Sequence, residues 1–255
     1  MAEGDTILRA ARRLHEALTG SEVAVRTPGR RRPQGGAGRL DGRTMRGAEA
    51  RGKHLLLHFS GGLALHSHLG MRGSWHLYRP GERWRRPARS AWIALAGERA
   101  EAVNFNGTSM RIVREAELAR DPRLARLGPD ILAAETTPAA AAAALRARAE
   151  PTAELGDALL DQSALAGVGN IFKSEGCFEA QTSPWRRLDG LDDEELARVA
   201  GATRELMVAA VETGHQPKRI YGRAGMPCPR CGGPISARGQ GDSARTTYWC
   251  ARCQP

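Results

Sequence analysis

Four of the five cysteines form two Cys-x2-Cys pairs near the end of the chain: Cys228 with Cys231, and Cys250 with Cys253. Two such pairs separated by roughly 15–20 residues are typical of a zinc site. Each pair places two thiolates on one tight turn, and two turns complete a tetrahedral shell with no open position. We therefore expect one structural Zn²⁺, which folds a segment too short to form its own core.

The segment around these cysteines is basic and partly aromatic. It contains Arg230, Arg238, Arg245, Arg252, Tyr248 and Trp249. The whole chain of 255 residues has a formal net charge of +10 and a pI near 10.2. A surplus of positive charge favours a nucleic acid as partner. The alternatives are a zinc module that only caps the fold, and a codon bias that raises the arginine content.

Composition also limits the cellular setting. No apolar run approaches the roughly 18–20 residues of a membrane span, and Glu3 and Asp5 stand where a signal peptide would be basic. Four cysteines in metal spacing indicate a reducing interior. We expect a cytoplasmic protein. The fifth cysteine, Cys177, lies in an apolar stretch and is expected to be a buried small hydrophobe.

The first 120 or so residues have mainly strand character after one N-terminal helix. Asp5 or Thr6 is expected to cap that helix and Gly20 to end it. A basic loop-like stretch, 26–38, follows. Strands are expected at 54–59 and 63–69, joined by a hairpin at 60–62, and then at 75–78, 90–95 and 100–105.

From Arg114 the pattern becomes helical. The alanine-rich run 138–150 has high helix propensity and little bulk, which predicts a surface helix. Two short helices, 155–162 and 171–180, flank a glycine turn. A longer helix, 191–213, ends at Gly214, and the zinc module begins at about Gly225.

The glycine turn reads Gly167-Val-Gly169-Asn170 and opens a helix. Glycines allow close approach of a ligand, and free N–H groups at a helix start bind anions. Asn170 adds a side-chain donor, and Lys173 follows one turn later. The favoured ligand is a DNA phosphate, whereas the simpler alternative is a tight helix–helix turn.

Two amines near the start of the chain are candidate chemical groups. Lys53, in Arg51-Gly-Lys-His54, is one of three lysines, and its compact point charge suits a phosphate; the alternative is an ordinary surface lysine. If Met1 is removed, Ala2 exposes an α-amine whose reference pKa is about 7.7–8.0, so that roughly a fifth to a third is neutral at pH 7.4. Such an amine can attack a sugar C1′ and form a Schiff base. Glu3 is placed to move protons, or to interact with the first helix dipole.

Four motifs, in order, resemble the formamidopyrimidine-DNA glycosylase / endonuclease VIII family of DNA repair enzymes. They are Ala2-Glu-Gly-Asp-Thr6, Arg51-Gly-Lys-His54, Leu160-Asp-Gln with Gly167-Val-Gly-Asn170, and Tyr221-Gly-Arg with the four cysteines to Gln254. They span nearly the whole chain. The N-terminal segment Glu3-Gly-Asp-Thr6 and the segment Met71-Arg-Gly-Ser-Trp75 look more like the endonuclease VIII members of the family, which favour oxidised pyrimidines. Within these members, the chain looks most similar to a branch found in actinomycete-type bacteria.

The resemblance implies an α+β multidomain fold. An N-terminal antiparallel β-sandwich with one long helix (1–122) would precede a helix–two-turns–helix DNA-binding domain (123–222) and a zinc-finger β-hairpin (223–255). It implies a monomeric, nucleoid-associated bacterial DNA glycosylase and abasic-site lyase that acts on damaged double-stranded DNA by β,δ-elimination. Ala2 would be the nucleophile and Glu3 the proton donor. DNA phosphates would be held by Lys53, Gly167, Gly169, Asn170 and Arg245, and Lys53 and Arg245 would count among the catalytic residues as well.

Position 2 departs from the family, whose nucleophile there is proline. Ala2 keeps an α-amine, but a primary one, whose imine need not carry a positive charge. Three hypotheses remain. Ala2 is a working alternative nucleophile, or the chain is a weak or inactive relative that binds damaged DNA, or position 2 was altered deliberately to trap a complex. An alternative from another functional class is an RNA-binding zinc-ribbon protein. The match of four residues to the DNA glycosylase motifs argues against it: Glu3, Lys53, Asn170 and Arg245.

Overall fold

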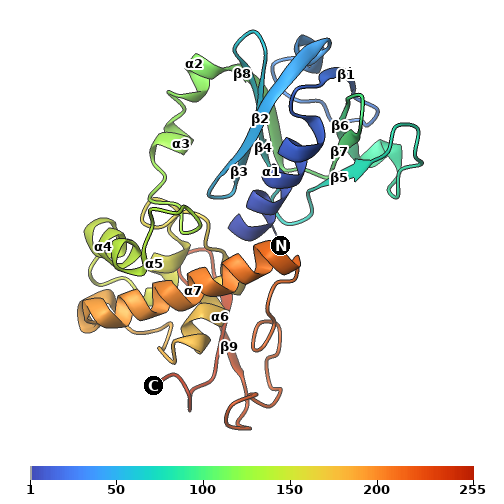
Figure 1. The fold of residues 1–255 in the computed structure, drawn as a ribbon. Helices are drawn as coiled ribbons and strands as arrows, with labels where there is room; N and C mark the ends of the chain where they lie inside the picture. The colour runs from blue at the N-terminus through green and yellow to red at the C-terminus, as the bar shows by residue number, and fades with distance from the viewer. Residues whose placement is uncertain (1) are drawn as a thin grey trace. The chain divides into compact units, whose positions relative to one another are not determined.

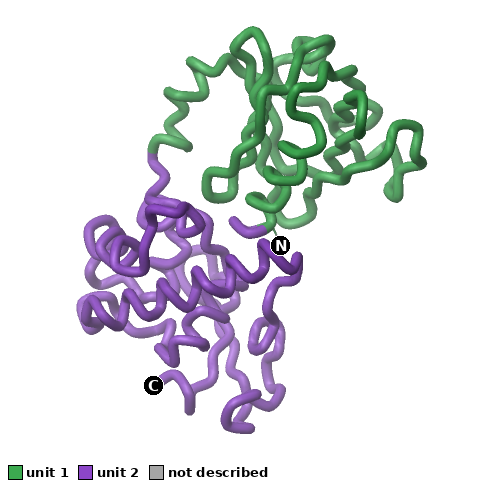
Figure 2. The backbone as a smooth tube through the Cα atoms, in the orientation of Figure 1, with its two compact units in different colours: residues 1–2, 6–125 green, residues 3–5, 126–255 purple. Residues whose placement is uncertain are grey.

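The computed structural model describes residues 2–255, which group into two compact units (Figure 2). Unit 1 consists of Ala2 and residues 6–125, and unit 2 of residues 3–5 and 126–255. The N-terminal tripeptide 3–5 therefore belongs to the unit formed by the second half of the chain. The division into three domains made from the sequence stays a prediction.

Unit 1 is an antiparallel β-sandwich, as expected (Figure 1). Its strands are β1 (Glu22–Arg26), β2 (Arg43–Arg51), β3 (His54–Phe59), β4 (Leu63–His68), β5 (Ser74–Tyr78), β6 (Ala91–Ala96), β7 (Glu101–Phe105) and β8 (Ser109–Arg114). Their order is β5-β7-β6-β1-β2-β3-β4-β8. Strand β1 joins the two halves, because Glu22 and Val23 pair with β2 whereas Ala24 to Arg26 pair with β6.

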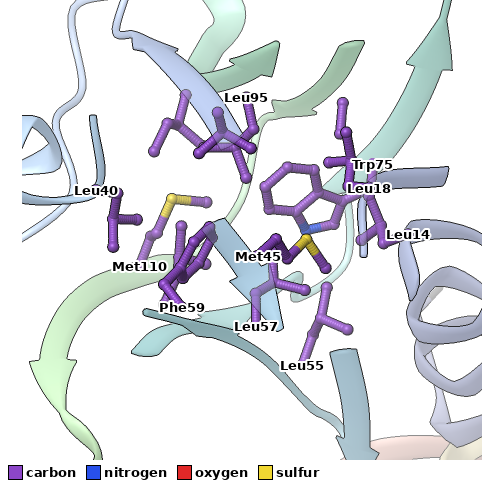
Figure 3. Close-up of a cluster of buried hydrophobic side chains, with 14 of the residues drawn as sticks. Leu14, Leu18, Leu40, Met45, Leu55, Leu57, Phe59, Trp75, Leu95 and Met110 are labelled. Atoms are coloured by element: carbon purple, nitrogen blue, oxygen red, sulfur yellow. The ribbon is translucent and has the colours of Figure 1, made fainter. Parts of the chain in front are cut away.

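Helix α1 (Gly4–Leu18) places its apolar stripe in the core of unit 1. Leu14 and Leu18 of the helix belong to one cluster of buried side chains that also contains Phe59, Trp75 and Leu95, from both halves of the sandwich (Figure 3). The helix begins at Gly4, so Asp5 and Thr6 lie within its first turn, and the prediction that one of them caps it is wrong. Glu3 consequently stands just before the helix, with its side chain available to another element.

The strand predictions 54–59, 63–69, 75–78, 90–95 and 100–105 are confirmed to within about one residue at each end. Three strands were not predicted: β1, β2 and β8. Strand β2 is mostly polar and only partly buried along its length, so it shows no clear apolar alternation. Short 3₁₀ helices follow at η1 (Ala37–Leu40) and η2 (Ala88–Ser90), and unit 1 closes with α2 (Glu115–Leu118) and α3 (Pro122–Ala125).

Unit 2 contains α4 (Pro138–Arg148), α5 (Leu155–Leu160), α6 (Asn170–Glu179), η3 (Leu188–Gly190), α7 (Asp193–Thr213), β9 (Ser236–Gln240) and β10 (Arg245–Trp249). Helix α7 starts at a capping box formed by Asp192 and Glu195 and ends at Gly214, whose φ is 76°. Helix α4 is less superficial than predicted, because Ala141, Ala142 and Leu145 pack toward α7. Small alanines permit that close approach of two helices.

Helix α6 is buried along almost its whole length, from Asn170 to Phe178, although it carries several polar side chains. It packs against α7 (Figure 1), and β10 also contacts it. We call residues 225–255, with β9, β10 and the four paired cysteines, the cysteine hairpin. Cys177 lies in α6 with its side chain fully buried, which confirms its expected role as a small hydrophobe. Within residues 2–255, none of the helices has the length and apolar content needed to cross a membrane.

Candidate active site

The carboxylate of Glu3 lies at the N-terminus of α6. Its Oε1 accepts a hydrogen bond from Ile171 N at 2.8 Å, and its Oε2 accepts one from Phe172 N at 3.3 Å. Glu3 is completely buried. Backbone N–H groups and the positive end of a helix both stabilise an ionised carboxylate. Unit 2 therefore holds this acid in one orientation, and the peptide bond places it directly beside Ala2.

The glycine turn accommodates the N-terminal segment. A Cβ at Gly169 would lie 2.2 Å from Glu3 Cδ, a distance that no side chain could tolerate. Gly167 has φ of +99° and accepts a hydrogen bond from Gly4 N at 2.9 Å. The expectation of free N–H groups at this helix start is wrong for Ile171 and Phe172, since the anion there is Glu3 itself. Contact of Gly167 and Gly169 with DNA stays a prediction.

Asn170, the first residue of α6, contacts the cysteine hairpin. Its Nδ2 donates to Thr246 O at 2.8 Å. The nearby Tyr221 hydroxyl is partly buried, and burial is the main cause that raises the pKa of Tyr221 above its ordinary value, whereas Asn170 acts in the opposite direction. The phenol therefore keeps its proton at neutral pH and can donate it to a ligand.

Tyr221 is a candidate site residue to which sequence reasoning gave no role. Buried Glu175 fixes its backbone, because Glu175 Oε1 accepts from Ile220 N at 3.0 Å and from Tyr221 N at 2.8 Å. Its ring meets Tyr248 of β10 edge-on at 5.0 Å. The motif Tyr221-Gly-Arg was the available signal, but only the fold brings this hydroxyl to Asn170.

The four paired cysteines converge as predicted. Their Sγ atoms all lie within 4.8 Å of one another, with 3.9 Å between Cys228 and Cys253 and 3.5 Å between Cys231 and Cys250. A tetrahedral site with Zn–S bonds of about 2.3 Å requires sulfur–sulfur distances of about 3.8 Å. The donor set and its spacing fit Zn²⁺ with all four positions filled by protein.

Arg245 is the first residue of β10 and pairs with Gln240 across the hairpin. Its side chain is exposed beside a hollow of about 350 Å³, which Asp157, Asp161 and Asp242 also line. In the part of the chain that the structure describes, no ion pair involves Arg245. Its guanidinium is thus available to an external anion.

Lys173 is not at a solvent-facing anion site, which corrects the expectation drawn from its position in the sequence. Its side chain is fully buried and points into the hairpin, where Nζ donates to Thr247 Oγ1 at 2.5 Å. Burial lowers the pKa of Lys173 to about 8. The residue contacts the hairpin that carries Arg245 and has no direct access to a phosphate.

Unit 1 places Ala2 and Lys53 near the same short segment. Ala2 N donates a hydrogen bond to Gly70 O at 3.4 Å. Gly70 N in turn donates to His68 Nδ1 at 3.2 Å. Burial and the charge of Lys53 lower the pKa of His68, which shows that Lys53 lies near this histidine. Lys53 follows Gly52, whose φ is +56°, in the β2–β3 turn. A free Ala2 amine requires removal of Met1, and Met1 lies outside the residues that the structure describes.

Three family models match the chain in succession. "Formamidopyrimidine-DNA glycosylase N-terminal domain" matches residues 1–123, "Formamidopyrimidine-DNA glycosylase H2TH domain" residues 127–221, and "Zinc finger found in FPG and IleRS" residues 225–255. These ranges together account for nearly the whole chain.

Curated relatives match along the full length. The chain is 42% identical to "Probable endonuclease 8 2" of Streptomyces coelicolor, over 100% of this chain and 94% of the relative. It is 34% identical to "DNA-(apurinic or apyrimidinic site) lyase Nei2" of Mycolicibacterium smegmatis, over 100% and 99%. It is 33% identical to the formamidopyrimidine-DNA glycosylase of Thermus thermophilus, over 100% and 97%.

Solved structures share the fold. The MutM (Fpg) protein of Thermus thermophilus superposes with a TM-score of 0.79 at 30% identity and covers 99% of this chain and 98% of its own. Lactococcus lactis Fpg, solved non-covalently bound to DNA containing an abasic site, superposes with a TM-score of 0.82 at 20% identity and covers 99% of both chains.

Proposed function

Because this chain belongs to the formamidopyrimidine-DNA glycosylase family, we propose that it is a base-excision-repair DNA glycosylase and abasic-site lyase. The observation that carries the proposal is the buried Glu3 carboxylate, fixed on α6 and adjacent in sequence to Ala2. We propose oxidised pyrimidines as the preferred lesions, the preference implied by the resemblance to endonuclease VIII. The chain acts as a monomer on duplex DNA.

The proposed chemistry starts from the Ala2 α-amine after loss of Met1. The neutral amine attacks C1′ of the damaged nucleotide, the N–C1′ bond forms, and the bond from C1′ to the base breaks as the base leaves with a proton. One proton of the attacking amine leaves with the base, and the Glu3 carboxylate takes the other and passes it to the ring oxygen O4′ as the C1′–O4′ bond breaks, so that a C1′=N Schiff base results. Removal of a C2′ proton then expels the 3′ phosphate, and a second elimination expels the 5′ phosphate. Water finally hydrolyses the imine and restores the amine.

The remaining proposed residues hold the DNA backbone. Lys53, Asn170 and Arg245 bind phosphates next to the lesion, and the Gly167 and Gly169 turn supports this part of the surface. The Tyr221 hydroxyl, which lies near Asn170 and keeps its proton at neutral pH, is a further donor to the same backbone. Support comes from the exposed Arg245 guanidinium and from the net charge of +10. A zinc ion, when bound by the four cysteines, supplies a structural crosslink and no chemistry.

A second candidate function is binding of damaged DNA with weak or no catalysis. Ala2 in place of proline favours it, because the imine of a primary amine can lose its proton and then withdraws electrons less strongly during elimination. This protein would still recognise an abasic site, since the phosphate-binding residues do not depend on the nucleophile.

Borohydride trapping on a duplex with one abasic site separates these functions. We expect a covalent adduct that maps to the peptide beginning at Ala2, because borohydride reduces the Schiff base to a stable amine. The control is the same protein with its α-amine acetylated, which can still bind DNA but cannot form an imine. Intact binding without an adduct, in protein shown to lack Met1, would establish the binding function instead.

Arg245→Ala is expected to weaken binding by about tenfold on all sequences alike, because a phosphate contact carries no sequence information. The slope of log affinity against log salt should become less steep by about 0.9, the value for one phosphate contact. Fluorescence anisotropy between 50 and 200 mM salt measures both. Arg187→Ala is the matched control, since it removes one positive charge from an ion pair with Asp189 in the same unit. Equal effects of the two variants would mean that Arg245 acts only through net charge.

A further inference from the structure

Lys173 is a buried cation that the proposed chemistry does not use. Its side chain has 0% exposure, and Nζ donates to Thr247 Oγ1 at 2.5 Å and more weakly to Gln240 Oε1 at 3.4 Å. Among the described residues, no carboxylate forms an ion pair with it. An ammonium buried without a paired carboxylate lowers stability, and an apolar side chain of similar volume would avoid that loss. A role other than stability would account for this charge.

The hydrogen bonds around Lys173 run in one direction. The Thr247 hydroxyl donates to Gln240 Oε1 at 2.7 Å, so its oxygen is free to accept from Lys173. Gln240 Nε2 in turn donates to Glu154 Oε2 at 2.9 Å and to Pro184 O at 2.8 Å. The Thr247 hydroxyl and both hydrogens of Gln240 Nε2 are used in this series, and such a connected network is rigid.

This network fixes β10 on α6. Asn170 Nδ2 donates to Thr246 O at 2.8 Å, Lys173 donates to Thr247, and Ser174 Oγ accepts from Tyr248 N at 3.4 Å. The three helix residues stand at i, i+3 and i+4, so they share one face of α6. The three strand residues are consecutive and directly follow Arg245. The place of Arg245 relative to Asn170 therefore depends on this face of α6.

We propose that Lys173 is a positioning residue for phosphate binding, whose ammonium group holds β10 on α6 so that Arg245 and Asn170 contact the DNA backbone together. The proposal rests on the proposed function, in which Arg245 and Asn170 hold phosphates. Lys173 is not a second Schiff-base nucleophile, because its Nζ is enclosed and bonded to Thr247. It acts through Arg245.

A double-mutant cycle tests this role on a duplex with an uncleavable abasic analogue. Lys173→Met keeps the length of the side chain, removes its charge and donors, and is expected to weaken binding by about tenfold. The variant with both Lys173→Met and Arg245→Ala should bind no more weakly than Arg245→Ala alone, since two residues that act through one contact are not additive. Additive losses would show that Lys173 supports the fold in general and would overturn the proposal.

The pH profile gives a second readout that a merely structural residue would not change. Burial lowers the pKa of Lys173 to about 8, the neighbouring Arg245 lowers it as well, and Cys177, Asp157 and Glu3 act in the opposite direction. A phosphate bound at Arg245 favours the charged lysine, so DNA binding takes up a proton. Affinity of the native chain should therefore fall as pH rises from 7 through 9. The affinity of the Lys173→Met variant should not fall in this way. The Ala2 amine titrates in both proteins, so the difference between their pH profiles reports on Lys173 alone.

Thr247 supplies a matched pair of variants in case Lys173→Met does not fold. Thr247→Ser keeps the acceptor and should bind like the native chain, whereas Thr247→Val removes it and should bind as weakly as Lys173→Met. Zinc content measured on each protein establishes that the hairpin is intact. If the native chain binds the duplex and Lys173→Met binds equally well with the same pH profile, the proposed role of Lys173 is wrong and the proposed function is unaffected. A native chain that does not bind the duplex overturns the proposed function and this role with it.

Discussion

Replacing Glu3 by glutamine is expected to lower base excision by about 10²- to 10⁴-fold, the usual contribution of a positioned proton donor. Binding to a duplex with an abasic site should change by no more than about twofold, because the carboxylate faces Ile171 N and Phe172 N within the protein. Glutamine retains an oxygen that can accept from Ile171 N, so the N-terminal segment should keep its place. Single-turnover excision and anisotropy measure the two quantities separately.

Asp5→Asn is the matched control for Glu3→Gln. Asp5 is another buried carboxylate of the same N-terminal segment, but it accepts from Gln216 Nε2 at 2.9 and 3.1 Å. Its replacement should lower thermal stability without a comparable loss of excision. If Glu3→Gln abolished DNA binding, or if both variants lost excision equally, Glu3 would be a structural residue of unit 2 and its assigned chemistry would be wrong.

Removal of the metal from the four cysteines should unfold the cysteine hairpin and weaken binding to abasic DNA by about 100-fold or more. Structural zinc contributes about 10–16 kcal/mol to the folding of small metal-bound segments. Apart from its cysteines, the hairpin contributes few apolar residues to the core that it shares with Phe178 and Ile220, mainly Ile235 and Tyr248. Loss of the fold displaces Arg245 and the Thr246 carbonyl that Asn170 contacts. Chelation followed by anisotropy, with zinc measured by atomic emission, tests this.

The fifth cysteine provides the control for metal loss. Cys231→Ser should lose zinc and DNA binding together, whereas Cys177→Ala should retain one zinc per chain. Burial raises the pKa of Cys177 to about 12, and it lies in α6 outside the cluster of four thiols. Its replacement leaves a small cavity and should cost about 1 kcal/mol of stability. A zinc-free Cys231→Ser protein that binds DNA normally would contradict a structural role for the metal.

Features encoded within short spans were predictable from the sequence. The zinc spacing, the hairpin at 60–62 and the end of α7 at Gly214 each depend on residues near one another in the chain. The β-sandwich itself was expected through the family resemblance, whereas β1, β2 and β8 gave no clear local signal. Their pairing is set by neighbouring strands, and strand propensity depends strongly on that context.

The amino-acid sequence by itself determined the residue types of the site: an N-terminal acid, a glycine turn, Asn170, Arg245 and four cysteines. Only the tertiary structure decided which groups meet. Glu3 reaches Ile171 across 168 residues and occupies the helix N-terminus that a phosphate was expected to occupy. Lys173 reaches Thr247 across 74 residues and is buried in the hairpin interface instead of facing solvent. The physical reason is that a buried polar group takes whichever partner packing brings to it, and local sequence does not specify that partner.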